Sequence, residues 1–142
     1  MKNQIALVML GLALSTCIFA QKVDLSKVPS AVKNSFEKRF PEAKAKWEKE
    51  DGQYEAGFNQ AGKNMSAMFK PDGTFVESEM EIKVSELPAT VLAYVKSHYK
   101  GKSIKEGSKI TKANGTVEYE AEVNDKDVMF DKDGKFLKET KE

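Results

Sequence analysis

The feature that most constrains the fold is an internal repeat, in which three phrases of the sequence recur in the same order. Both members of the first pair have helical periodicity. Those of the second pair alternate between apolar and polar residues like a strand, and those of the third contain an Asp-Gly turn. The three pairs are residues 28–40 with 87–99, 54–59 with 119–124, and 68–75 with 129–136. Three matches in one order indicate that a single structural unit is present twice.

Each unit is expected to consist of a helix followed by antiparallel strands. Pro29 and Pro88 suit the first turn of a helix, and apolar residues recur every four positions after each of them. The stretch 116–124, TVEYEAEVN, alternates almost perfectly between apolar and acidic residues, which predicts a strand buried on one face only. Its outward positions are Glu118, Glu120 and Glu122.

The predicted fold is therefore α+β, with a first repeat at residues 24–84 and a second at 85–142 that together form one domain. A single helix on so short a sheet buries little apolar surface. We expect the two repeats to share one continuous sheet, with both helices on one face and a largely polar opposite face. The aromatic residues assigned to the core are Trp47, Tyr54, Phe58, Phe69, Phe75, Tyr119, Phe130 and Phe136.

The N-terminus differs from the rest of the chain. An unbroken apolar run, residues 5–20, follows Lys2 and precedes a polar segment. This pattern predicts a signal peptide at residues 1–20, cleaved after Ala20, and hence a periplasmic or secreted protein. Two alternatives are a membrane anchor, and lipidation at Cys17, which would hold the protein at the membrane.

The composition excludes several function classes. The chain has 142 residues, 23 basic and 22 acidic, and loss of Lys2 with the signal leaves 22 of each. A neutral chain has no long-range attraction to nucleic acid or to a lipid surface. Cys17 is the only cysteine and His98 the only histidine, and no phosphate loop or nucleophile elbow is present. These observations predict a protein that is not an enzyme and uses no cofactor or metal.

The phrase MFDKDGKF resembles the start of a calcium loop, with Asp131 and Asp133 ahead of Gly134. An EF-hand needs more oxygen ligands, and its glycine comes later. The first copy has Lys70 and Pro71 where ligands would be required. Asp-Gly between apolar residues is instead typical of a hairpin turn, so we predict a structural role for both copies.

The outward acidic row has two interpretations. It could be the solvated side of the sheet, paired across strands with lysines, or a surface that binds a basic partner. If the sheet binds a protein, the candidate contact residues are Glu55, Met68, Glu118, Glu120, Glu122 and Met129.

The combination of a VP..V...F...FP helix, a W…YE strand pair and an F..DG.F hairpin, in two copies, resembles the PepSY-like family. The resemblance covers residues 28–139. It implies tandem α-β units of the beta-lactamase-inhibitory-protein type, whose sheet forms one broad curved surface. It further implies an exported, non-enzymatic binding module that modulates a peptidase or another envelope enzyme. The alternatives are a periplasmic protein that binds calcium or a small ligand, and a hydrolase whose site has no recognisable motif.

Overall fold

The computed structural model describes residues 20–141, and within this range the chain forms two α-helices and nine strands. The helices are α1 (Ser30–Arg39) and α2 (Ala89–His98), each preceded by a short 3-10 helix, η1 (Leu25–Lys27) or η2 (Val84–Glu86). The strands are β1 (Gln21–Val23), β2 (Lys46–Glu50), β3 (Gln53–Gln60), β4 (Lys63–Phe69), β5 (Phe75–Ile82), β6 (Ile104–Lys112), β7 (Val117–Val123), β8 (Lys126–Asp131) and β9 (Phe136–Lys141).

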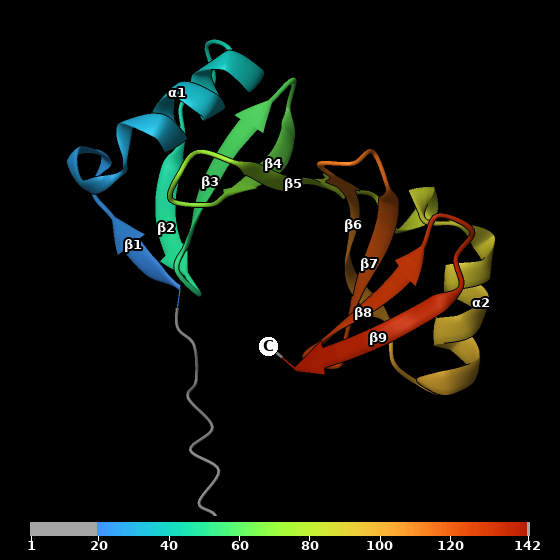
Figure 1. Ribbon diagram of the computed structural model, residues 1–142. Coiled ribbons are helices and arrows are strands. Elements are labelled where there is room, and N and C mark those ends of the chain that lie inside the picture. Colours follow the sequence, from blue (N-terminus) through green and yellow to red (C-terminus); the bar gives the residue numbers. More distant parts are fainter. Residues whose placement is uncertain (1–19, 142) are drawn as a thin grey trace, which may run out of the picture.

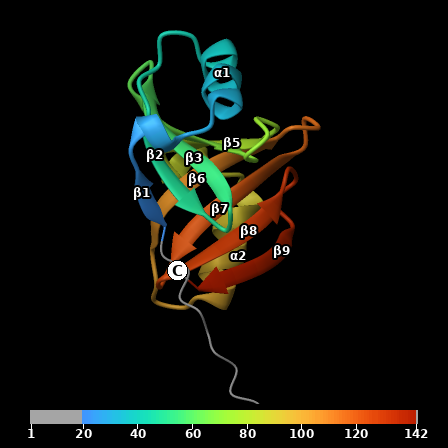
Figure 2. The ribbon, with the colours of Figure 1, turned by 60° about the vertical axis from the view of Figure 1, so that its left-hand side comes forward.

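All nine strands form one antiparallel sheet in chain order, which confirms the predicted α+β architecture. The sheet bends into an arch, and both helices lie on its outer, convex side (Figure 1). The strong twist of the sheet is evident when the molecule is turned (Figure 2). Strand β1 was not predicted, and it extends the sheet beyond the first repeat by pairing with β2.

The predicted signal peptide and the lipidation alternative at Cys17 fall on residues 1–19, outside the described part of the chain. The division into repeats at 24–84 and 85–142 also stays a prediction. In the structure each helix is followed by four strands, α1 by β2 to β5 and α2 by β6 to β9.

Each helix packs on an apolar cluster of its own. The first cluster is aromatic: the Phe36 ring lies 5.3 Å from Trp47 and 5.2 Å from Phe58, between ring centroids. The second is mainly aliphatic around Val91 and Val95, with Phe130 fully buried. The two units therefore share a sheet, but the buried residues described form two separate cores.

The repeated MF…DG phrases form equivalent hairpin connections, which confirms their structural interpretation. In both copies the register shifts at the Met-Phe step, between Met68 and Phe69 and between Met129 and Phe130. The extra residue of the bulge, Val76 or Leu137, is on the strand that follows the turn. The turns are then closed by side-chain carboxylates. Asp72 accepts the Thr74 N–H at 2.8 Å, and Asp131 accepts two backbone N–H groups at 2.9 Å.

The glycine of each turn lies against the start of a helix. Gly73 and Gly134 have φ of +87° and +78°, and a Cβ at either position would collide with the α1 or α2 segment. At Gly73 the obstacle is the Ala31 carbonyl oxygen, and at Gly134 it is the Thr90 side chain. Thr90 also donates its hydroxyl to the Asp133 carbonyl at 2.9 Å. The turns thus hold the helices against the sheet.

Replacement of Gly134 by alanine should therefore destabilise the fold more than the same change at Gly115. Gly115 has a similar φ of +85° but nothing within 4 Å of its would-be Cβ. We expect Gly115→Ala to cost about 1 kcal/mol through backbone strain. Gly134→Ala should cost about 3 kcal/mol, because Thr90 or helix α2 must also move. Urea unfolding measures both values, and equal losses would contradict the proposed contact between turn and helix.

Candidate partner-binding face

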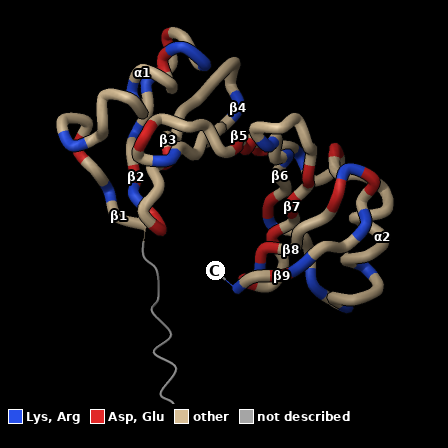
Figure 3. The backbone as a smooth tube through the Cα atoms, in the orientation of Figure 1, with Lys and Arg blue, Asp and Glu red and all other residues tan. Residues whose placement is uncertain are grey.

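The face of the sheet opposite the helices, called here the inner face, is dominated by acidic side chains. Residues directly opposite each other in the register share a face, so the face can be assigned strand by strand. Its acidic residues are Glu48, Glu50, Glu55, Glu77, Glu79, Glu81, Glu106, Glu118, Glu120, Glu122, Asp127 and Asp131. Its lysines are Lys22, Lys46, Lys112 and Lys138. Acidic residues gather along β5 and β7 in particular (Figure 3).

Several of these carboxylates face other carboxylates across the strands. The register pairs Glu48 with Glu55, Glu118 with Asp131, and Glu122 with both Glu106 and Asp127. No lysine of residues 20–141 stands directly opposite the acidic row of β7 in the register. The expected cross-strand pairing with lysines nevertheless holds for two of its three glutamates, Glu118 with Lys112 and Glu122 with Lys105. Like charges directly opposite each other destabilise a sheet. The arrangement is not one that sheet stability alone would favour.

Two lysines compensate part of this charge from neighbouring positions. Lys112 lies 2.5 Å from Glu77 and 3.4 Å from Glu118, and so bridges β5, β6 and β7. Lys105, the extra residue of a bulge in β6, reaches Glu122 at 3.0 Å and Asp125 at 2.8 Å. Both lysines belong to β6 and lie toward its two ends, on either side of the centre of the inner face.

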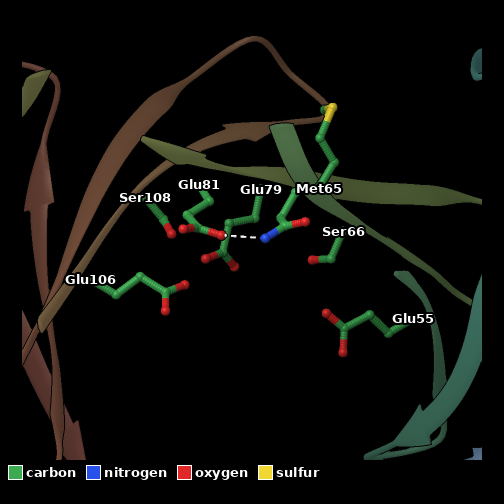
Figure 4. A pocket seen from close by; sticks show the side chains of 8 residues that line it. Glu55, Met65, Ser66, Glu79, Glu81, Glu106 and Ser108 are labelled. Atoms are coloured by element: carbon green, nitrogen blue, oxygen red, sulfur yellow. Dashed lines mark hydrogen bonds between the residues drawn. The ribbon is translucent and has the colours of Figure 1, made fainter. Parts of the chain in front are cut away.

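A shallow depression of about 230 Å³ lies at that centre, where β4, β5 and β6 adjoin (Figure 4). The carboxylates of Glu55, Glu79 and Glu106 point toward it from β3, β5 and β6. Glu81 is also at its edge, where its carboxylate accepts a hydrogen bond from the Asn64 amide at 2.7 Å. The depression spans the seam between the two units, so neither unit could form it alone.

Glu79 is the carboxyl group of the depression whose pKa is shifted by burial and by the neighbouring carboxylates. Burial raises the pKa of its carboxyl above the ordinary value of 4.5, a hydrogen bond from Ser108 opposes the rise, and repulsion from Glu55, Glu106 and Glu77 adds to it. Asp127 behaves similarly, because burial and the neighbouring Glu122 raise its pKa. In both cases the folded protein disfavours the ionised carboxylate.

All six contact residues predicted from the sequence lie on the inner face. Glu55 stands opposite Met68, and Glu120 stands opposite Met129. Met129 is only 7% exposed, so it contributes more to the floor of the face than to its accessible surface. The role of the six residues in binding stays a prediction.

Sequence reasoning missed the acidic residues of β5, although the signal was present. The segment FVESEMEI alternates almost as clearly as the β7 segment, with Ser78 the one polar residue at an apolar position, and it places Glu77, Glu79 and Glu81 on the inner face. Glu106 could not have been assigned in the same way. The bulge between Ile104 and Glu106 changes the phase of the strand within β6.

Over residues 20–141, no three His, Cys, Asp or Glu side chains are grouped so that they could hold a metal ion. In the same range, neither α-helix is long and apolar enough to cross a membrane. His98 ends α2 as an exposed residue whose Nδ1 is 3.0 Å from the Tyr94 carbonyl.

Comparison with known families and structures agrees with this architecture. The model of the family described as "beta-lactamase-inhibitor-like, PepSY-like" matches residues 18–77 and again 52–138. The chain belongs to this family. No curated protein matches the chain.

Solved structures from Bacteroides share the fold. A protein described as BLIP-like, from Bacteroides fragilis, is 25% identical, with a TM-score of 0.65 over 80% of this chain and 86% of that one. A DUF2874 family protein from Bacteroides ovatus is 21% identical, with a TM-score of 0.69 over 80% and 86%. A protein described as periplasmic, from Bacteroides eggerthii, is 18% identical, with a TM-score of 0.71 over 80% and 88%.

Replacing Glu79 by glutamine should stabilise the protein at neutral pH by about 1 kcal/mol or less, because glutamine bears no charge to desolvate. The raised pKa means that the ionised carboxylate destabilises the fold at pH values above its folded pKa. As the pH falls through that value, the wild-type carboxyl becomes protonated, and the advantage of the variant should disappear. Thermal melts between pH 4 and pH 8 test this, with Glu37→Gln on the exposed side of α1 as control. A constant difference across that range would show that charge is not the cause.

Proposed function

We propose that this protein is an exported, non-enzymatic binding module of the periplasm, which holds a protein partner against its inner face. The observation that carries the proposal is the inner face itself: no helix of the described chain covers it, and several of its carboxylates stand directly opposite one another. Natural sequences depart from local stability rules chiefly where function requires it. The face is also broad, since it runs across all nine strands.

Export is supported by the apolar segment at residues 5–20 and by the structural similarity to a protein described as periplasmic. The name of the family, which refers to enzyme inhibitors, favours an enzyme as the partner. We propose a peptidase or another envelope enzyme, modulated when the inner face covers part of it. The alternative of a calcium-binding protein is not favoured by any grouping of ligands within residues 20–141.

Site-specific photo-cross-linking in intact cells of the native host tests the proposal. A photoreactive amino acid would replace Ser66 or Thr140, which lie on the inner face, or Ser35 or Ala93, which lie on the outer helices. We expect a defined protein adduct from the inner positions and none from the outer ones. Adducts formed only from Ser35 or Ala93 would assign binding to the helical side and refute the proposal.

A further inference from the structure

We propose that the segment of the partner seated on the inner face is cationic, and that one of its Arg or Lys side chains enters the depression between Glu55, Glu79 and Glu106. This inference rests on the proposed function and specifies the chemistry of the partner. The occupant is a projecting loop or an extended segment of a protein.

The first argument is the distribution of charge over the molecule. The whole chain is nearly neutral, with 23 basic and 22 acidic residues, yet twelve acidic residues and four lysines lie on the inner face. The outer helices have the opposite balance. Helix α1 has three basic residues and only Glu37 as an acid, and α2 has Lys96 and no acid. A basic surface is therefore attracted to one side of the protein and repelled by the other, which orients the encounter.

The second argument is the cost of the face in the unbound protein. Carboxylates oppose carboxylates at Glu48 and Glu55 in the first unit, and at Glu122 and Asp127 in the second. Burial and mutual repulsion further raise the pKa of Glu79. A cation placed among these carboxylates reduces their mutual repulsion, and this reduction contributes favourably to the free energy of binding. An acidic or neutral partner would not reduce the repulsion between the carboxylates.

The third argument is the shape and lining of the depression. Carboxylates approach it from three strands, which suits a guanidinium or ammonium group that donates several hydrogen bonds in different directions. The rest of the lining is mostly polar and includes Asn64, Ser66 and Ser108, so the depression suits the charged head of Arg or Lys better than an apolar group.

The test uses the purified protein and two synthetic peptides of equal length, one of alternating Arg and Gly and one of alternating Glu and Gly. Calorimetry should show binding of the Arg peptide alone. The Kd should rise roughly tenfold between low salt and 0.3 M salt, because screening weakens the attraction. In the double variant Glu55→Gln/Glu79→Gln, the Kd should rise roughly fivefold or more.

The matched control is Glu37→Gln/Glu42→Gln, which removes the same charge from exposed positions in and just after α1. It should bind the Arg peptide like the wild type. Because Glu79→Gln is expected to raise the melting temperature, weaker binding by the inner-face variant cannot be explained by unfolding. Absence of Arg-peptide binding, or equal losses in both double variants, would overturn the inference.

The cross-linking experiment separates this inference from the proposed function. A partner that meets Ser66 through an acidic or neutral segment would refute cationic recognition and leave the binding face intact. A partner that meets it through a segment rich in Arg or Lys would support both. Adducts from the outer helices alone would refute both.

Discussion

Pairing of β5 with β6 joins two helix-bearing units, each with its own apolar cluster, into one sheet. Six residue pairs, from Glu77 with Lys112 to Ile82 with Gly107, form this seam. The helices add no connection of comparable extent, because α1 packs on the first cluster and α2 on the second. The curvature of the arch, the continuity of the inner face and the depression between the units all follow from this one antiparallel pairing.

The outer side of the sheet is apolar and buried under the helices, whereas the inner side is acidic and is not covered by any helix within residues 20–141 (Figure 1). Outer positions bury aromatic and aliphatic side chains, and Phe69 and Phe130 at equivalent places in the two units are both fully buried. Inner positions place carboxylates opposite one another, and the lysines that could neutralise them stand mostly at the margins. This division is understandable if the inner face is completed by another molecule, since burial of the outer side supplies the stability that the inner side reduces.

Much of the fold could be predicted because its signals are local. The alternation of apolar and acidic residues predicted which residues of β7 share a face, and the two Asp-Gly phrases predicted two hairpin turns. The opposition of Glu122 to Glu106 and Asp127 could not be predicted, because it depends on the register with two neighbouring strands and on a bulge in β6. The separation of the buried residues into two cores could not be predicted either. Periodicity shows that a helix has an apolar face, but it does not show which strands that face covers.

The internal duplication also shows which positions the scaffold leaves free. On the outer side the copies agree, as with Tyr54 and Tyr119 or Phe75 and Phe136. On the inner side some equivalent positions agree, as with Glu55 and Glu120 or Met68 and Met129. Others differ in charge: Gly57 corresponds to Glu122, and Glu77 to Lys138. Packing against a helix restricts the outer residues, whereas no helix restricts the inner ones. The charge at some inner positions can therefore change without loss of the fold, so the scaffold alone does not determine the surface that it presents.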